Sequence, residues 1–551
     1  MKTIHSRLLA LLMAVALLAS LCACGQSDTA VTTTTADSAT TTLADEVTTT
    51  VADGEPTDSV VTTTETDITT ATNGATTAAT QATTATTTAA TKDVWEGATK
   101  ATTTVVATTV ATTAKPSPML NGVPLSDYTI VYGKNQPDYS RTAATYIQEQ
   151  VKERTGLALT VCSDAEKQSA HEIVVGETNR AISRTLNADT EGTQFAILAQ
   201  GDHVAMEAQY FVIAAAAYYF TENYIAPIGQ NKQVPEKVSV HSPIVETPRN
   251  FIFLIGDGMG VNQTFLFEDM SAVAETDYSD GEDFFYGYLL PAQGHARTAS
   301  LSGVTDSAAG STALATGFKT YNQRLGRDGA NNAVPSLTEI AGDLGKATAI
   351  MTTEDPTGAT PSGFSVHVDG RYEAALIEQG QTELKNKYDT LFFCGYDLYT
   401  KSGFSAIERK LNYYLDKLNA DPDGFFLMYE EAHIDSGGHS KDLQLGFRAV
   451  VRFNQAIATF MEFAFYHPDT FLIITADHET GALKKVNGKF AYTSDSHSGV
   501  DVPVFAYGKG SEVFNGKTVE NVQIPKTIAA MWGKTIIGTD NTKYPSLISV
   551  K

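Results

Sequence analysis

The sequence predicts an α/β protein whose largest domain contains a mostly parallel β-sheet flanked by helices. The first observation is a set of continuous apolar runs, the pattern of parallel strands that are covered on both faces. These runs lie at 251–255, 347–351, 425–429, 471–475 and 502–506. The second observation is that segments with helical spacing separate the runs, as in repeated strand–helix units. The third is that the first four runs lead directly into polar, mostly acidic residues, and ligands of open parallel sheets bind at the carboxyl ends of the strands.

Residues 1–23 are predicted to be a lipoprotein signal peptide. Basic residues precede an apolar run at 8–21, which is too short for a comfortable membrane span. The sequence Leu-Cys-Ala-Cys-Gly at 21–25 resembles a bacterial lipobox, in which Cys24 would be lipidated. We therefore expect an exported protein with a lipid anchor on Cys24, held on the outer face of the bacterial cell membrane. A plain cleavable signal peptide is the alternative.

Residues 24–117 are predicted to be a disordered linker rich in Thr and Ala. Large apolar residues are too few in this segment to form a core. At about 3.3 Å per residue, a stretched tether of this length would reach roughly 300 Å.

Residues 118–246 are expected to form a small α/β sandwich domain. Strands are predicted at 128–132 and 171–176, a hairpin at 195–199 and 203–208, and helices at 141–155 and 209–224. The pattern loosely resembles the non-catalytic domain that precedes the catalytic domain in several exported glycosidases. No convergent catalytic site is evident here, so a docking or carbohydrate-contacting role and a structural spacer remain alternatives.

Charge and cysteine content exclude two classes of protein. The 551-residue chain has 63 acidic and 39 basic residues and a formal net charge of -24. This balance argues against nucleic acid as a partner, because phosphate backbones are bound by fields of Lys and Arg. The chain has 4 cysteines, two of them in the leader, so a disulfide framework is not expected.

One serine is a candidate nucleophile. Ser307 follows Asp306 within a stretch of small residues at 305–313 that has the pattern of a helix start. Free backbone N–H groups and the positive end of the helix dipole suit a phosphate group at such a position. An ordinary helix N-terminus rich in Ser and Ala is the alternative interpretation.

Acids and imidazoles follow the ends of the predicted strands, where they could bind cations. Mixed carboxylate and imidazole ligands suit Zn²⁺, and sets made only of oxygen ligands suit Mg²⁺. The first glycine-rich turn is not a dinucleotide fingerprint, because Val261 stands where the third glycine would be. The polar residues near these strand ends are, in chain order, Asp257, Thr352, Thr353, Glu354, Asp355, Thr360, Glu430, Asp435, His439, Asp477, His478, Glu479 and, before the last run, His497.

These motifs occur in the order seen in alkaline phosphatases, a family that this chain resembles over residues 249–510. The motifs are the Gly-Asp-Gly turn at 256–258, Asp-Ser-Ala at 306–308, Ala-Thr-Pro at 359–361, Glu430 with Asp435 and His439, Thr-Ala-Asp-His at 475–478, and His-Ser-Gly at 497–499. Residues 247–551 are therefore expected to be an alkaline-phosphatase-like catalytic domain that hydrolyses phosphate monoesters.

The resemblance also implies a role for each motif residue. Ser307 would be the nucleophile that becomes phosphorylated. One zinc ion would bind Asp435, His439 and His497. A second zinc ion would bind Asp257, Asp477, His478 and the Ser307 oxygen. Magnesium would bind Asp257, Thr360 and Glu430, and Arg371 would hold the phosphate group, oriented by Asp306.

The chain departs from the family pattern at the third metal site and above the active site. Gly358 stands where the family usually has Asp or His beside magnesium, so magnesium binding is expected less firmly than zinc binding. Glu354 and Asp355 are near in sequence but not equivalent in position. Ser436 stands where many relatives have Lys or His near the phosphate. Only 18 residues separate His478 from His497, where many relatives have a longer insertion that takes part in a dimer. We expect an open site, and the oligomeric state stays undetermined.

Two other functions remain as alternatives. A phosphodiesterase of the same superfamily usually has threonine as its nucleophile, but an open site would suit a diester. A sulfatase is disfavoured, because Ser307 lacks the Cys/Ser-x-Pro-x-Arg context. A catalytically inactive cell-surface binding protein would fit the linker and the small domain. However, an inactive binding protein would have no need for such a complete set of metal-binding side chains.

Overall fold

The structure is a computed structural model that describes residues 61–62, 86–87, 117–135, 138–186, 192–227, 229–236, 239–241, 245–268, 284–394, 404–536 and 542–550. The predicted signal peptide and Cys24 lie outside the described residues, as does most of the predicted linker. In the linker, β1 (Val61–Thr62) pairs antiparallel with β2 (Thr86–Thr87). Residues 113–551 form one compact unit. Among the residues described, no helix combines the length and apolar character needed to cross a membrane.

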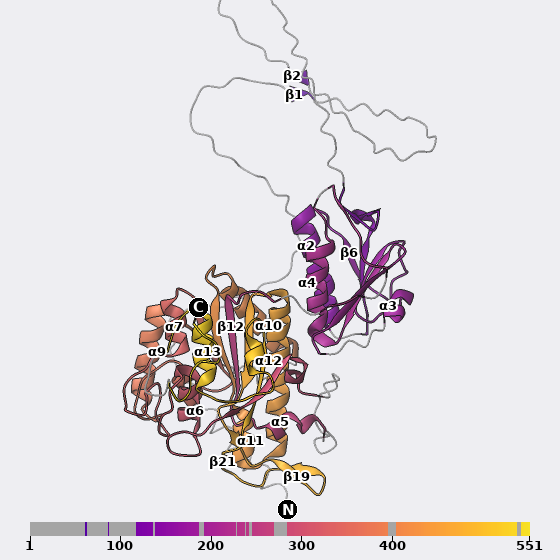
Figure 1. The fold of residues 1–551 in the computed structure, drawn as a ribbon. Helices are drawn as coiled ribbons and strands as arrows, with labels where there is room; N and C mark the ends of the chain where they lie inside the picture. The colour runs from indigo at the N-terminus through magenta and orange to yellow at the C-terminus, as the bar shows by residue number, and fades with distance from the viewer. Residues whose placement is uncertain are drawn as a thin grey trace, which may run out of the picture. The chain divides into compact units, whose positions relative to one another are not determined.

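A six-stranded sheet forms the centre of residues 129–241, the purple part of Figure 1. Its strand order is β11-β8-β9-β7-β5-β6. Strands β5, β6, β7 and β9 are parallel, whereas β8 runs antiparallel to both β9 and β11. The strands are β5 (Thr129–Tyr132), β6 (Thr160–Ser163), β7 (Glu172–Val175), β8 (Phe195–Gln200), β9 (His203–Ala208) and β11 (Ser239–His241).

Helices cover both faces of this sheet, as expected for a small α/β sandwich. On one face, α2 (Asp138–Thr155) packs beside α4 (Ile213–Tyr224), which follows the 3-10 helix η2 (Tyr210–Val212). On the other face, α3 (Ala181–Leu186) packs on β8 and β9. Strand β7 is buried at every residue because its side chains point alternately to the two faces of the sheet, and helices cover both faces. A minor three-stranded sheet near the start contains β3 (Met119–Leu120), β4 (Val123–Pro124) and β10 (Asn231–Lys232), with the 3-10 helix η1 (Leu125–Asp127).

The main sheet has eight strands in the order β15-β14-β16-β12-β17-β22-β13-β23. It confirms the predicted mostly parallel sheet, and β12 at its centre is buried along its whole length. The strands are β12 (Asn250–Gly256), β13 (Ala292–Arg297), β14 (Ala347–Thr352), β15 (Leu391–Cys394), β16 (Phe425–Glu431), β17 (Thr470–Thr475), β22 (Val502–Tyr507) and β23 (Thr518–Glu520).

One strand runs against the others. The run at 502–506 has the same apolar pattern as the parallel strands, but β22 is antiparallel to both β17 and β13. The prediction of parallel strands was wrong at this position. An apolar run reports burial on both faces and carries no information about direction.

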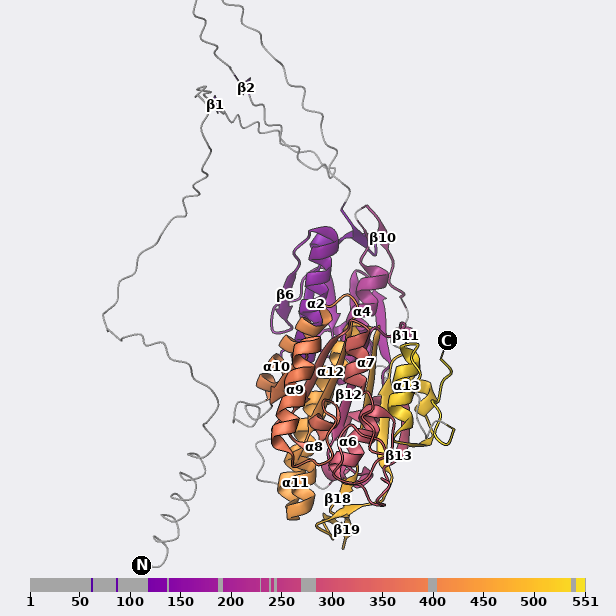
Figure 2. The same cartoon turned by 90° about the vertical axis from the view of Figure 1, so that its left-hand side faces the viewer.

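Helices lie on both faces of the main sheet (Figure 2). On one face, α12 packs against β12, β16 and β17 and against α10. On the other face, α7 and α8 pack on β14 and β16, and α6 and α13 pack beside them. The helices are α5 (Val261–Thr264), α6 (Ser307–Thr316), α7 (Leu337–Asp343), α8 (Ala359–Gly363), α9 (Ala374–Tyr388), α10 (Phe404–Asn419), α11 (His433–Ser440), α12 (Leu443–Tyr466) and α13 (Gln523–Met531), with the 3-10 helices η4 (Tyr286–Leu289) and η6 (Ser511–Phe514).

Aromatic residues on α12 and η4 join the small domain to the part of the chain that contains the main sheet. The rings of Tyr146 and Tyr466 lie 4.3 Å apart, and those of Phe211 and Tyr286 lie 5.0 Å apart. One buried apolar cluster accordingly contains residues from both sheets. The predicted boundary at 246 separates two sheets that share a continuous core.

A buried acid on α12 predicts a pH-dependent stability. The side chain of Glu462 is buried, its Oε1 accepts no hydrogen bond, and burial together with the charge of Glu408 raises its pKa to about 8. Its pKa in the folded protein is therefore raised above its value in the unfolded chain. Hence the folded form holds a proton that the unfolded form releases as pH rises from about 4.5 to about 8.

We expect the stability of the native protein to fall across this pH window relative to that of Glu462→Gln, by a few kcal/mol. Thermal melts of both proteins at pH 5, 6, 7 and 8 would measure the difference in Tm. A difference that stays constant from pH 5 to pH 8 would show that Glu462 is not held in its neutral form.

Candidate active site

Four adjacent strands of the main sheet end at the same edge. The register pairs Gly256 of β12 with Glu431 of β16, and Thr352 of β14 with Glu430. Because these strands are parallel, the residues that follow their carboxyl ends are brought together. Asp257 follows β12, Glu430 lies at the end of β16, and Asp477 and His478 follow β17.

His497 reaches the same edge because β22 is reversed. The strand β21 (His497–Ser498) pairs antiparallel with β18 (Glu479–Thr480), and β22 starts shortly afterwards. The start of an antiparallel strand lies at the edge where its parallel neighbours end. Between β18 and β21 the chain forms a short hairpin of β19 (Lys484–Val486) and β20 (Lys489–Ala491).

A glycine allows the turn after β12 to approach α11 closely. Gly258 has φ +77°, and a Cβ atom built there would lie 2.7 Å from the Cα atom of Asp435. Its N–H donates to Asp477 Oδ1 at 3.3 Å. A larger residue at position 258 would therefore push the turn that carries Asp257 away from Asp435, a predicted ligand of the neighbouring zinc ion.

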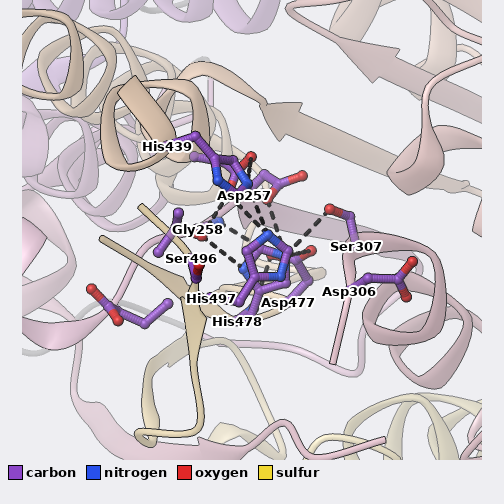
Figure 3. A network of polar contacts seen from close by, with 12 residues as sticks. Asp257, Gly258, Asp306, Ser307, His439, Asp477, His478, Ser496 and His497 are labelled. Atoms are coloured by element: carbon purple, nitrogen blue, oxygen red, sulfur yellow. Dashed lines mark hydrogen bonds and ion pairs between the residues drawn. The ribbon is translucent and has the colours of Figure 1, made fainter. Parts of the chain in front are cut away.

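Ser307 is the first residue of α6, as predicted. Asp306 caps the helix, because its Oδ1 accepts the N–H of Ala309 at 3.0 Å. The Ser307 side chain is buried and points towards the imidazole cluster, and its Oγ lies 3.3 Å from His478 Nε2 (Figure 3). The hydroxyl thus lies at a helix N-terminus and beside the candidate metal ligands.

The small residues of α6 are explained by packing against Asp477. A Cβ atom at Gly310 would lie 3.0 Å from the Cβ atom of Asp477 and 3.1 Å from its carbonyl oxygen. The helix can therefore approach the end of β17 only where its side chains are absent or small. This close packing fixes Ser307 relative to Asp477 and His478.

Two groups of side chains could each hold a cation. The first contains Asp257, Asp477 and His478, whose potential ligand atoms lie within 4.8 Å of one another. In the second, His439 Nε2 lies 3.0 Å from His497 Nε2 and 3.3 Å from Asp435 Oδ2. His478 lies beside this group too, with its ring centroid 3.6 Å from that of His497. The two predicted zinc sites are adjacent, and His478 stands between them.

Hydrogen bonds on the far side of each imidazole leave its Nε2 atom free to bind a cation. His439 Nδ1 lies 2.6 Å from the carbonyl oxygen of Asp495, and His497 Nδ1 lies 2.9 Å from that of Thr305. A carbonyl oxygen only accepts, so each Nδ1 carries a proton, and the neutral form of each ring then presents a lone pair on Nε2. Two lone pairs 3.0 Å apart repel each other unless a cation lies between them.

A third group contains only oxygen atoms. Thr360, on α8, donates from Oγ1 to Asp257 Oδ2 at 3.5 Å, and Thr352 donates from Oγ1 to Glu430 Oε2 at 2.5 Å. Glu430 is fully buried and its Oε1 accepts no hydrogen bond. Asp257, Thr360 and Glu430 are the residues predicted to hold magnesium, and the structure brings all three together.

The electrostatics of the first and third groups favour a bound positive charge. Burial first, and then neighbouring carboxylates, raise the pKa of Asp257 and Glu430 well above their usual values and that of Asp477 to about 8. Burial, followed by the charges of His497 and His439, lowers the pKa of His478 well below its usual value. Oδ1 of Asp257 and Oδ2 of Asp477 accept no hydrogen bond. Carboxylates that are buried, crowded and unsatisfied in this way fit a site for divalent cations.

The alkaline phosphatase family profile matches residues 248–392 and 405–492. This match contains every candidate residue of the active site except His497. This part of the chain is a domain of the alkaline phosphatase family. Membership makes it a metal-dependent hydrolase of phosphoesters.

Relatives with this family name come from several bacteria. Alkaline phosphatase 3 of Bacillus subtilis is 25% identical over 408 residues, which span 51% of this chain and 88% of that protein. Alkaline phosphatase 4 of the same species is 28% identical over 347 residues, spanning 53% and 75%. A solved structure of alkaline phosphatase from the Antarctic bacterium TAB5 is 26% identical, covers 52% of this chain and 98% of that one, and has a TM-score of 0.46.

Arg371, which resembles the phosphate-binding arginine of alkaline phosphatases, lies beside Asp306. Its Nη1 donates to Asp306 Oδ2 at 3.5 Å, and the same carboxylate oxygen accepts the N–H of Gln323. After burial and the charges of His497 and His439, the positive charge of Arg371 also contributes to lowering the pKa of His478. Asp306 thus both caps the helix that starts with Ser307 and orients Arg371.

Several residues that support this alkaline phosphatase site were not predicted from the sequence. Glu431 points to the opposite side of β16 from Glu430 and pairs with Arg452 Nη2 at 2.9 Å, which ties the strand to α12. The alternation of side chains along a strand could have separated these two acids. Thr480 donates from Oγ1 to Asp435. No sequence signal distinguishes this threonine from its neighbours.

Proposed function

We propose that the protein hydrolyses phosphate monoesters through a phosphoserine intermediate on Ser307. The observation that carries this proposal is the position of the Ser307 hydroxyl. It lies at the N-terminus of α6, 3.3 Å from His478 Nε2 and beside two groups of metal-ligand type. A hydroxyl in this position meets both the positive end of a helix dipole and the cations held nearby.

Two zinc ions and one magnesium ion are the cofactors that this donor set suits. Asp435, His439 and His497 would hold one zinc ion, and Asp257, Asp477, His478 and the Ser307 oxygen would hold the other. Asp257, Thr360 and Glu430, which offer oxygen atoms only, would hold magnesium. When bound, the zinc ions supply the positive charge that ionises a hydroxyl or a water and stabilises a leaving oxygen.

The chain's own residues would act in two displacements. In the first, Ser307 Oγ forms a bond to phosphorus, the bond to the substrate alcohol breaks, and the alcohol leaves with a proton. In the second, water attacks the phosphoserine, the bond from Ser307 Oγ to phosphorus breaks, and inorganic phosphate is released. Backbone N–H groups at the start of α6 and the guanidinium of Arg371 would orient the phosphoryl oxygens throughout.

Cys24 and the preceding signal peptide complete the proposal for the whole chain. The lipobox-like sequence at 21–25 supports export and a lipid anchor on the outer face of the cell membrane. The linker at 24–117 would then separate the enzyme from the membrane surface.

The relevant experiment compares a chromogenic phosphate monoester with the matching diester. The purified protein would be assayed on p-nitrophenyl phosphate and on bis-p-nitrophenyl phosphate, with added Zn²⁺ and Mg²⁺. We expect a higher kcat/KM for the monoester. A higher kcat/KM for the diester would instead support a phosphodiesterase of the same superfamily. The site has an open side at His439, which is 45% exposed, and an open side would accommodate the second ester group.

Arg371 is expected to contribute mainly to phosphate binding. Replacing Arg371 with alanine removes a guanidinium that can donate two hydrogen bonds to phosphate. We therefore expect the inhibition constant of inorganic phosphate to rise about 10- to 100-fold. Arg371→Lys should restore only part of the affinity, because an ammonium group cannot contact two oxygens in one plane. Competitive inhibition of p-nitrophenyl phosphate hydrolysis by phosphate would measure both variants. Equal inhibition constants in all three proteins would remove Arg371 from the phosphate site.

A further inference from the structure

The third cation site departs from the family pattern at Gly358, and the structure shows what occupies the space. A Cβ atom built on Gly358 would lie 2.1 Å from Glu354 Oε1 and 3.0 Å from Glu354 Cδ. The carboxylate of Glu354 therefore occupies the volume in which a side chain at position 358 would begin. The family's Asp or His at this position could not coexist with Glu354 as it is placed here.

The backbone at Gly358 does not itself require glycine. Its φ is -55° and its ψ is 167°, values that any residue adopts. The absence of a side chain at this position is explained by the space that Glu354 needs. Glycine at position 358 therefore goes together with the carboxylate of Glu354, which occupies the space that the family's Asp or His would need.

The loop from β14 to α8 aims Glu354 towards the third cation site. The hydroxyl of Thr352 accepts the N–H of Glu354 at 3.1 Å and donates to Glu430, so it connects the two glutamates. Asp355 instead closes the loop, since its Oδ1 accepts the N–H of Thr357 at 2.8 Å. Of the two acids in the loop, Glu354 is partly buried and its charge acts on Glu430 and Asp257, whereas Asp355 is exposed.

The negative charges of Glu354 and Glu430 are only partly compensated by neighbouring side chains. Among neighbouring charges, that of Glu354 has the largest effect on Glu430, and it also acts on Asp257. Glu430 is fully buried with its Oε1 accepting no hydrogen bond. His433 and Arg371 offset part of the charge of Glu354, but Oε1 of Glu430 accepts no hydrogen bond. A cation bound by both carboxylates would satisfy this oxygen and remove the repulsion.

We propose that Glu354 is a ligand of the third cation and replaces the missing side chain at position 358. This inference rests on the proposed metal-dependent function. The site then contains oxygen atoms from Asp257, Glu354, Thr360 and Glu430. Such a set suits Mg²⁺, which prefers hard oxygen ligands and retains some of its water.

Magnesium binding tests this inference without relying on activity. Each protein would be stripped with EDTA, reloaded with Zn²⁺ and titrated with Mg²⁺, and metal content and Tm would be measured at each step. We expect Glu354→Gln to bind Mg²⁺ at least about tenfold more weakly than the native protein while keeping its zinc. Asp355→Asn is the matched control, because it removes a charge from the same loop and retains the Oδ1 acceptor.

A compensating pair of substitutions distinguishes a ligand from a residue that only supports the loop. Glu354→Ala removes the carboxylate and leaves space over Gly358. In that background, Gly358→Asp would place a carboxylate in the vacated volume, with only a small adjustment against the carbonyl oxygen of Asp355 at 3.0 Å. We expect the double variant to regain Mg²⁺ binding and the single Glu354→Ala variant to lack it.

Equal Mg²⁺ affinity in the native protein, Glu354→Gln and Asp355→Asn would overturn the inference. Monoesterase activity, measured separately, reports on the proposed function. If Mg²⁺ affinity is unchanged while activity persists, only the assignment of Glu354 fails. If Glu354→Gln loses Mg²⁺ while the native protein hydrolyses no phosphate monoester, the proposed function fails and the assignment stands.

Discussion

Replacement of Ser307 by alanine is expected to lower kcat for p-nitrophenyl phosphate by at least about a thousandfold. The substitution removes the only atom that forms a bond to phosphorus in the first proposed displacement. The smaller alanine side chain would fit at this position without strain, because the start of α6 is already lined with small side chains. Zinc content and Tm should therefore stay close to those of the native protein, which metal analysis and a thermal melt would verify.

Ser311→Ala provides the control on the same helix. Ser311 is buried one turn further along α6, and its Oγ donates to the carbonyl oxygens of Ala308 and Ala359. Its loss should reduce stability by about 1 kcal/mol and leave kcat nearly unchanged. A Ser307→Ala protein that retained native kcat with both zinc ions bound would contradict a serine nucleophile.

Removal of the metal ions is the second change with a large expected effect. EDTA should abolish hydrolysis and lower Tm by at least about 5 °C, because Asp257, Glu430 and Asp477 then lie buried together without positive charge. Adding back Zn²⁺ and Mg²⁺ should restore both quantities. Differential scanning calorimetry and a chromogenic assay on the same samples would measure them.

Ser307→Ala is also the control for this experiment. The variant should show the same gain in Tm when metal is added, although it remains inactive, since its carboxylates and imidazoles are unchanged. If activity and Tm were unaffected after metal analysis had shown complete removal, the three groups of ligands would have no role in function.

The sequence was sufficient to predict five of the eight strands of the main sheet and its functional edge, but not β13, β15 or β23. Continuous apolar runs indicated buried strands, and the acids after 251–255, 425–429 and 471–475 indicated which edge carries the site. The rule that parallel strands bring their carboxyl ends together then grouped residues that lie up to 221 positions apart, from Asp257 to His478. Asp306 and the small residues that follow it predicted a helix start, and the structure places Ser307 as the first residue of that helix.

Other features could not be predicted because they depend on contacts made only after folding. The reversal of β22 depends on the path of the chain after β21, which the apolar pattern does not encode. The tautomers of His439 and His497 are fixed by backbone carbonyl oxygens, which are present at every position of every chain. Glu354 was predicted to be near the third site but not equivalent to a ligand. The relation between positions 354 and 358 became visible only in the structure, where the Glu354 carboxylate fills the space over Gly358.

The most direct test of the proposed mechanism is to trap the enzyme during turnover. The metal-loaded protein would be mixed with excess p-nitrophenyl phosphate, quenched in acid, digested and mapped by mass spectrometry. We predict one added phosphoryl group on the peptide that contains Ser307, and none in Ser307→Ala. Metal-dependent hydrolysis by the native protein with no phosphoryl group on Ser307, or with the group on another residue, would contradict the phosphoserine mechanism.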